Sequence, residues 1–213
     1  MTLPYANLTP ENLRRLLSGL YHDICATLSG QVSSKEEFIL FSRQLTCDTP
    51  SNPLNVEIKV FDQPESILDI VHEGYELGSL EALHDAIAPA MPGGKLYALF
   101  VKKKLAHFSR MMADRRDRNF GPFLGNFGGV KDICIGPCRT NPSFRGNGFY
   151  AMALNRICED AGSRQQGNAY IYCALSNTSS INGIKKAKFK TMGRIVKRRF
   201  FIWTVIKINP EKD

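Results

Sequence analysis

Apolar residues recur at helical spacing in the first part of the chain. A cap-and-proline signal opens this stripe and a glycine closes it, which predicts a helix over residues 9–30. Ser33 and Glu36 have the spacing of a capping box, so the apolar positions that follow predict a second, shorter helix ending near residue 45. We therefore expect an N-terminal helical extension, taken as residues 1–50.

From residue 56 onward, strand and helix patterns alternate. The strands carry apolar residues at every second position, and the helices repeat them at every third or fourth. This alternation predicts an α/β fold for a second domain, taken as residues 51–213. The predicted elements are a strand at 56–61, a helix at 64–75, a hairpin at 96–111, a strand at 130–138, a helix after residue 148 that ends at Gly162, a strand at 169–175, a short helix at 178–187, and strands at 193–197 and 200–208 around a basic turn.

Composition is consistent with one globular core and an appendage. The chain has 213 residues, of which 43% are hydrophobic and 23% charged, so it can bury a core. No apolar run reaches the about 18 residues that span a membrane, and no secretion signal opens the chain. We therefore expect a cytoplasmic protein without a membrane partner.

Cysteine and histidine spacing does not fit a metal site. The closest two of the six cysteines, Cys134 and Cys138, are separated by three residues of a strand-like segment, and the four histidines share no ligand spacing. Free thiols in a reducing compartment fit this spacing better. We expect neither a metal nor a disulfide framework.

The net charge of +8 indicates an anionic partner but not its class. A phosphorylated cofactor, an acidic acceptor or a nucleic acid would be drawn to a basic face, and a merely solvated face is as common. Aromatic residues interleave with the charge at strand spacing, which favours core packing over base stacking, so we do not expect a nucleic-acid partner. The basic residues gather near the C-terminus at Lys185, Lys186, Lys188, Lys190, Arg194, Lys197, Arg198 and Arg199.

An Arg-Gly-Asn-Gly turn at residues 145–148 connects a strand directly to a helix. Two glycines at a helix start allow the backbone to approach a ligand, and the first N–H groups of the helix lack partners. The turn is therefore a candidate anion site, and a diphosphate suits it. A tight connection without any ligand accounts for such a turn about equally well.

The surroundings of this turn resemble the GNAT superfamily of acyl-CoA-dependent N-acyltransferases. In motif A of that superfamily, a proline three residues before the arginine precedes an Arg-Gly-x-Gly turn, and Pro142 stands at that position. The resemblance covers residues 56–208 and implies a mixed, mostly antiparallel central sheet flanked by helices. After the next strand it continues at Asn177, Ser180, Lys186 and Phe189.

The resemblance implies an N-acetyltransferase with acetyl-CoA, or another acyl-CoA, as co-substrate. A primary amine of a small acceptor would attack the thioester directly, and a backbone N–H near Cys138 would polarise the carbonyl. Backbone groups of Cys138 and Thr140 would bind the pantetheine arm as an extra strand. The other implied cofactor-binding residues are Arg145, Gly146, Asn147, Gly148 and Phe149 at the pyrophosphate, Asn177 on the next strand, and Ser180 or Lys186 at the outer part.

Two positions depart from the superfamily pattern, and the acid–base residues stay open. Ile184 occupies the place of a tyrosine able to protonate the leaving thiolate, and Lys188 replaces a glycine. Candidate general bases are Asp132 and Tyr172, although a solvated strand end and a core aromatic account for these two residues as well. Cys138 fits an inert sheet cysteine better than a covalent acyl acceptor. The departures favour an alternative, a catalytically weak CoA-binding regulatory module with the same fold.

The acceptor is expected to bind opposite the turn, between the first helices, the hairpin and the loop at 114–129. Arg115, Arg116 and Arg118 of this loop are candidates to grip a carboxylate or phosphate on a small amine-bearing metabolite. The N-terminal helices either cover that cleft or mediate self-association into a homo-oligomer, because their leucine stripe must be buried against something.

Overall fold

The structure, a computed structural model, describes most of the chain from residue 34 onward. The chain divides into two compact units, one of residues 1–36 and 196–207 and the other of residues 37–195 and 208–213. The predicted helix over 9–30 and the loop arginines Arg115, Arg116 and Arg118 lie outside the described residues, and the domain division at residue 50 stays a prediction. The described residues are 34–46, 56–63, 66–78, 94–113, 129, 131–200 and 203–210.

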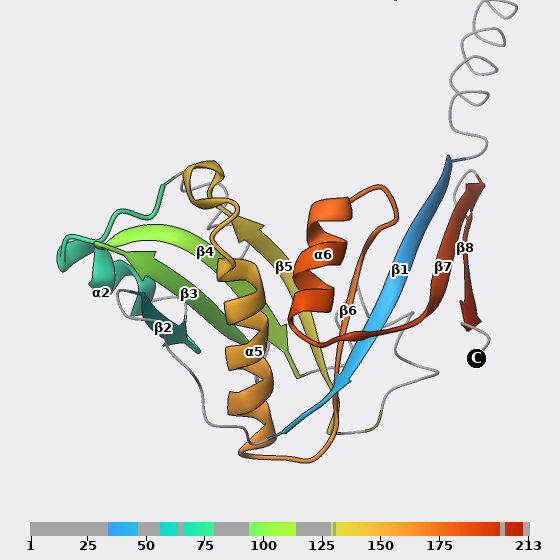
Figure 1. Cartoon of the computed structure of the whole chain (residues 1–213), viewed down its shortest axis with the longest axis horizontal. Helices are drawn as coiled ribbons and strands as arrows, with labels where there is room; N and C mark the ends of the chain where they lie inside the picture. Colours follow the sequence, from blue (N-terminus) through green and yellow to red (C-terminus); the bar gives the residue numbers. More distant parts are fainter. Residues whose placement is uncertain are drawn as a thin grey trace, which may run out of the picture. The chain divides into compact units, whose positions relative to one another are not determined.

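Every element predicted from residue 56 onward forms, with small changes in its bounds (Figure 1). The result is a mixed α/β fold with a large sheet flanked by helices, as the sequence indicated. The elements in chain order are β1 (Ser34–Gln44), β2 (Glu57–Phe61), α2 (Ser66–His72), β3 (Lys95–Val101), β4 (Lys104–Met112), β5 (Ile133–Thr140), the 3-10 helix η1 (Pro142–Phe144), α5 (Phe149–Gly162), β6 (Asn168–Ala174), α6 (Thr178–Lys186), β7 (Lys190–Phe200) and β8 (Trp203–Pro210).

The predicted second N-terminal helix is wrong, because residues 34–44 form the strand β1. This strand pairs antiparallel with β6, from Phe38 opposite Ala174 to Gln44 opposite Asn168. Leu40 and Phe41 are both fully buried although neighbours in a strand point to opposite faces. A run that is apolar on both faces carries no period of two, so the cap signal suggested a helix, and pairing with β6 overrode it.

The basic turn predicted at 197–199 is also wrong, because β7 continues as a strand to Phe200. Buried Gly193 and Ile195 alternate with exposed Arg194, so the strand period continues toward the basic run. Lys197 forms an ion pair of 3.0 Å with Glu36. This lysine is therefore a charged residue on the surface of a strand, where charged side chains are common. A cluster of charged residues alone is weak evidence for a turn.

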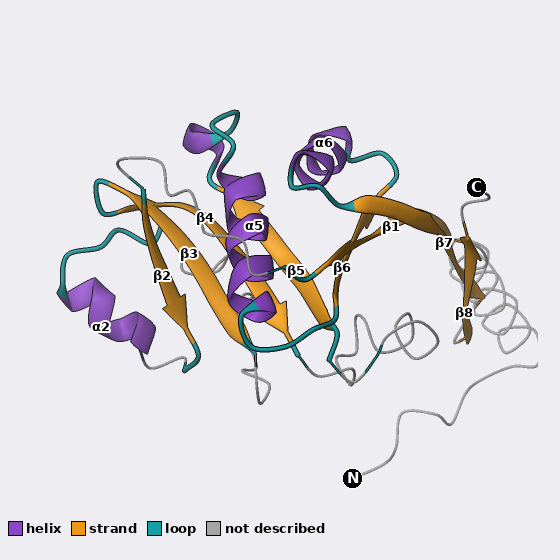
Figure 2. Ribbon diagram, turned by 60° about the horizontal axis from the view of Figure 1, so that its bottom comes forward, coloured by secondary structure: helices purple, strands orange, loops and turns teal. Residues whose placement is uncertain are grey.

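Strand β3 is buried on both faces. In β3, Leu96, Ala98 and Phe100 pack in one apolar cluster with residues of α2, whereas Tyr97 and Leu99 belong to clusters that contain α5 residues. The alternation along one strand therefore separates two cores. Helix α5 packs against β3, β4 and β5 on its face of the sheet (Figure 2).

Strands β5 and β6 pair over only a short length. The strand order is β2-β3-β4-β5-β6-β1-β7-β8, and β5–β6 is a parallel pair inside an otherwise antiparallel run from β2 to β1. Its paired positions are Ile133 with Ala169 and Cys134 with Tyr170. Beyond Cys134, β5 continues to pair with β4 but not with β6. The two strands therefore separate toward their C-terminal ends, which is where open α/β sheets bind ligands.

Candidate functional site

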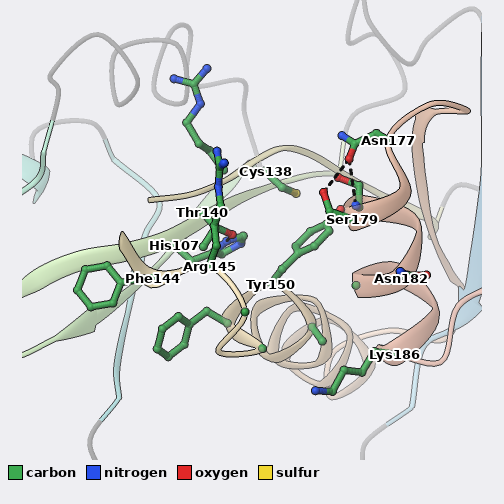
Figure 3. A pocket seen from close by; sticks show the side chains of 17 residues that line it. His107, Cys138, Thr140, Phe144, Arg145, Tyr150, Asn177, Ser179, Asn182 and Lys186 are labelled. Carbon is green, nitrogen blue, oxygen red and sulfur yellow. Dashed lines mark hydrogen bonds between the residues drawn. The ribbon is translucent and has the colours of Figure 1, made fainter. Parts of the chain in front are cut away.

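A pocket of about 750 Å³ lies where β5 and β6 separate. Its walls come from β4, the C-terminal end of β5, the glycine-rich turn, the first turn of α5, and α6 (Figure 3). All of these segments belong to one compact unit. The residues that line it are His107, Cys138, Arg139, Thr140, Phe144, Arg145, Gly146, Gly148, Phe149, Tyr150, Ala151, Asn177, Ser179, Ser180, Asn182, Gly183 and Lys186.

The glycine-rich turn has a backbone that suits glycine and few other residues. Gly146 has φ 84° and Gly148 has φ 78°, both in the left-handed region. Gly148 is also the N-cap of α5, and no side chain caps the helix there. Asn147 holds the turn from the other side, since its Nδ2 donates to the carbonyl oxygen of Phe144 at 3.1 Å. The helix therefore presents its N-terminus to the pocket, where an anion is favoured.

Lys186 adds a positive charge at this helix terminus. A Cβ placed on Gly148 would lie 3.6 Å from the Lys186 Nζ, so the ammonium group sits beside the turn. Arg145, which is exposed, lines the same end of the pocket. Two side-chain cations and a helix N-terminus together make this end electropositive, and a doubly or triply charged anion fits it.

Asn177 shapes the opposite wall by capping α6. Its Oδ1 accepts from the backbone N–H of Ser180 at 3.1 Å and from the hydroxyl of Ser179 at 2.9 Å. Asn177 and Ser180 both line the pocket. The N-terminus of α6 is thus satisfied by the chain itself, in contrast to that of α5.

The inner wall is polar although it is buried. His107, with 1% of its surface exposed, pairs through Nδ1 with Thr140 Oγ1 at 2.7 Å and through Nε2 with Ser109 Oγ at 2.8 Å. Burial lowers the pKa of His107 to about 3, so the imidazole is neutral at physiological pH. Burial also raises the pKa of Cys138 to about 11, against the opposing effect of hydrogen bonds with Ser109 and Tyr150. Cys138 is therefore a protonated thiol.

Tyr150 stands between α5 and α6 and reaches the same wall (Figure 3). Its ring centroid lies 5.4 Å from that of His107. A Cβ on Gly183 would be 2.5 Å from Tyr150 Cδ1, so the absence of a side chain at that position makes room for the ring. Burial, followed by the neighbouring Cys138 and Cys173, raises the pKa of Tyr150. Its phenol is protonated at neutral pH.

No family model matches the sequence, and no curated protein matches it either. Solved structures do match: an acetyltransferase from the GNAT family of Colwellia psychrerythraea is 14% identical, with a TM-score of 0.50, and the match covers 85% of this chain and 61% of that one. The chain has the GNAT fold. GCN5-related N-acetyltransferases from Kribbella flavida and Sphaerobacter thermophilus match 90% of this chain at 10% and 11% identity, with TM-scores of 0.53 and 0.52.

This chain covers only part of the length of the solved structures that it matches. This chain spans 61% of the Colwellia protein and 58% of the Sphaerobacter protein, less than two thirds of each, and 73% of the Kribbella protein. At such identities the likeness concerns the fold and not the substrates. Among the described residues, no helix is long and apolar enough to cross a membrane, and no cluster of His, Cys, Asp or Glu forms a candidate metal site.

The GNAT fold brings together nine of the ten residues that the sequence assigned to the cofactor. The exception is Asn147, whose side chain holds the turn and does not line the pocket. The nine that line the pocket are Cys138, Thr140, Arg145, Gly146, Gly148, Phe149, Asn177, Ser180 and Lys186. Their roles in binding stay predictions.

The two candidate bases lie elsewhere. Asp132 precedes β5, and its carboxylate accepts from the backbone N–H of Asn168 at 2.7 Å and from that of Gly129, which ties the starts of β5 and β6 together. The Tyr172 ring packs edge-on against Phe38, with centroids 5.4 Å apart. Neither residue lines the pocket.

Eight pocket residues were not assigned to the site from the sequence: His107, Arg139, Phe144, Tyr150, Ala151, Ser179, Asn182 and Gly183. The sequence analysis found no ligand spacing among the four histidines and assigned no site role to Tyr150. The period of two in the hairpin puts His107 and Ser109 on one face, which was an available signal. Their position opposite Thr140 and Cys138 depends on the β4–β5 register, which has an irregularity between Ser109 and Met111.

Proposed function

We propose that this protein transfers an acetyl or other acyl group from acyl-CoA to a primary amine of a small acceptor. The observation that supports this proposal best is the continuity of the pocket. An electropositive end at Gly148 and Lys186 suits the diphosphate of CoA. The edge of β5 that no longer pairs with β6 beyond Cys134 leads away from this end. An extended pantetheine arm can pair with such a strand edge as a further strand would.

Different residues of this chain would bind different parts of acyl-CoA. Backbone N–H groups from Arg145 to Phe149 and the Lys186 ammonium would hold the diphosphate. Backbone groups of Cys138 and Thr140 would align the pantetheine arm, and Asn177 with Ser180 would bound it on the α6 side. Acyl-CoA supplies an activated thioester, and a backbone N–H near Cys138 would stabilise the negative charge that develops on its carbonyl oxygen.

Direct attack by the amine fits this pocket better than a covalent enzyme intermediate. The pKa of Cys138 is raised by burial to about 11, so little thiolate exists at neutral pH to accept an acyl group. Asp132 and Tyr172 remain candidate bases only through a longer path, because neither lines the pocket.

The acceptor class remains a proposal from the sequence. We expect a small amine that carries an acidic group, gripped by Arg115, Arg116 and Arg118, in a cytoplasmic protein that self-associates through its N-terminal segment or covers its cleft with it. Replacing the three arginines by alanine should reduce turnover of acidic amines more than that of neutral amines. A triple variant that loses turnover of acidic and of neutral amines by the same factor would contradict this acceptor class.

The decisive experiment is calorimetric titration with acetyl-CoA and CoA. Wild type should bind with a dissociation constant of about 1–100 µM, as substrates of enzymes commonly do. A Gly146→Asp/Gly148→Asp variant should lose binding, because it adds like charge and side chains where the diphosphate would lie. The matched control is Gly74→Asp/Gly78→Asp, whose glycines have φ 83° and 75° and nothing within 4 Å. Absence of binding by the wild type would overturn the proposal.

The regulatory alternative is favoured by one observation. Ile184 is fully buried in α6 and has no proton to donate, so the position that carries a tyrosine in many GNAT members is chemically silent here. CoA binding without acyl transfer to any amine in a broad acceptor screen would support the alternative. Release of free CoA on addition of an amine would exclude it.

A further inference from the structure

Five polar side chains on the inner wall form one connected series. His107 Nδ1 forms a hydrogen bond of 2.7 Å with Thr140 Oγ1. His107 Nε2 forms one of 2.8 Å with Ser109 Oγ. Ser109 lies opposite Cys138 in the β4–β5 ladder and is fully buried. The Cys138 thiol interacts in turn with the side chains of Ser109 and Tyr150. The two ends of the series, Thr140 and Tyr150, both line the pocket, whereas Ser109 does not.

The series can be hydrogen-bonded in either of two directions. If Thr140 donates to Nδ1, the Nε2–H of His107 donates to Ser109, Ser109 donates to the Cys138 sulfur, and Cys138 donates to the Tyr150 oxygen. If the other tautomer is present, every donor and acceptor in the series is exchanged. Each of the five groups can both donate and accept a proton, provided that the imidazole is neutral. Burial keeps it so.

We propose that His107, Ser109 and Cys138 relay a proton between Thr140 and Tyr150. The relay joins two points of the same pocket, so one reacting group can lose a proton at one end while another gains a proton at the other. This inference rests on the proposed acyl transfer, in which an amine must lose a proton and a thiolate must gain one. The relay takes over the proton donation that Ile184 cannot perform.

The transfer balances in atoms and charge. The amine nitrogen forms a bond to the carbonyl carbon, the carbon–sulfur bond breaks, and its electron pair stays on the sulfur of CoA. The attacking nitrogen loses a proton to the hydroxyl oxygen at one end of the relay. Each group then donates its own proton to the next group, and the hydroxyl at the other end protonates the thiolate of CoA. After the transfer all five groups are neutral and His107 has the opposite tautomer. Water in the pocket then takes a proton from the end that received one and gives a proton to the other end, which restores the starting tautomer.

The first test removes the link that does not touch the pocket. Ser109→Ala takes one hydroxyl from the middle of the series, and Ser42→Ala on β1 is the matched control. Release of free CoA from acetyl-CoA would be followed with a panel of amino acids and amino sugars as acceptors. We expect Ser109→Ala to lower kcat by about 10²-fold, the usual contribution of acid–base groups, with the KM for acetyl-CoA unchanged. An unchanged kcat would overturn the relay.

The second test reads the relay without turnover. Imidazole nitrogen resonances of labelled protein report which ring nitrogen of His107 carries the proton. Tyr150→Phe removes the hydroxyl at the far end, where it makes no hydrogen bond to His107, and should change the balance of the two tautomers. The same tautomer balance in wild type and Tyr150→Phe would contradict the relay. Failure of acetyl-CoA to bind the wild type would instead contradict the proposed function, so the two failures are distinguishable.

Discussion

At the scale of single residues, His107 is a buried side chain whose hydrogen bonds and neutral charge state organise one wall of the pocket. Both of its ring nitrogens are paired with hydroxyl groups, so the neutral imidazole is satisfied although it has 1% of its surface exposed. Protonation would make both nitrogens donors and would place a charge among apolar neighbours. The fold therefore keeps the imidazole neutral down to a pH of about 3.

This burial makes protein stability depend on pH in a defined direction. The pKa of His107 lies at about 3 in the folded state and at 6.5 without the fold, so the unfolded chain binds more protons between these values. Stability should fall as pH drops below 6.5, by up to about 1.4 kcal/mol per pH unit from this group. Chemical denaturation of wild type and His107→Phe between pH 7 and pH 5 measures it. Identical pH slopes in both proteins would refute the assignment.

Gly183 is a residue whose importance comes from a neighbour. A methyl group there would lie 2.5 Å from Tyr150 Cδ1, far inside contact distance. Gly183→Ala should destabilise the protein by about 1–3 kcal/mol, as overpacking does, although alanine is the better helix former. Denaturant titration of Gly183→Ala, Tyr150→Ala and the double variant checks this. The two effects should be strongly non-additive, and simple additivity would show that the ring and the helix do not press on each other.

At the scale of elements, Arg43 of β1 acts as a clamp that connects this strand to two helices. Arg43 Nη1 donates to Asn155 Oδ1 of α5 at 2.6 Å and to the carbonyl oxygen of Ala187, just after α6, at 2.9 Å. One side chain thus connects the strand to both helices that border the pocket. A cation at the C-terminal end of α6 also complements the helix dipole.

The clamp predicts a specific loss of stability. Arg43→Met keeps much of the apolar stem but removes the two hydrogen bonds, and it should lower the free energy of unfolding by about 2–4 kcal/mol. Arg194→Met on the exposed surface of β7 is the control and should change little. Denaturant titration of both variants gives the comparison. Equal effects of the two substitutions would show that the contacts of Arg43 contribute nothing particular.

At the scale of the whole molecule, the sequence predicted the type of each α-helix and β-strand after residue 56, because periods of two and 3.6 were clear there, but it did not predict the 3-10 helix η1 between β5 and α5. It failed where pairing decides: the apolar run of β1 became a strand through contact with β6. The anion end of the pocket was predictable, since Gly146 and Gly148 act through local backbone geometry. The wall of His107 and Ser109 was not, because it depends on register across β4 and β5, including an irregularity that no local signal marks.

The two-sided burial of β3 also has a consequence for protein engineering. Its residues toward α2 and its residues toward α5 belong to separate apolar clusters, so substitutions on one side reach the other only through the backbone of the sheet. Exposed Val71 lies in α2, and the glycines Gly74 and Gly78 follow this helix; none of the three lines the pocket. Stabilising changes made there should add to those made elsewhere and leave the pocket unchanged. The α2 layer is the region in which to raise the melting temperature before the pocket is redesigned.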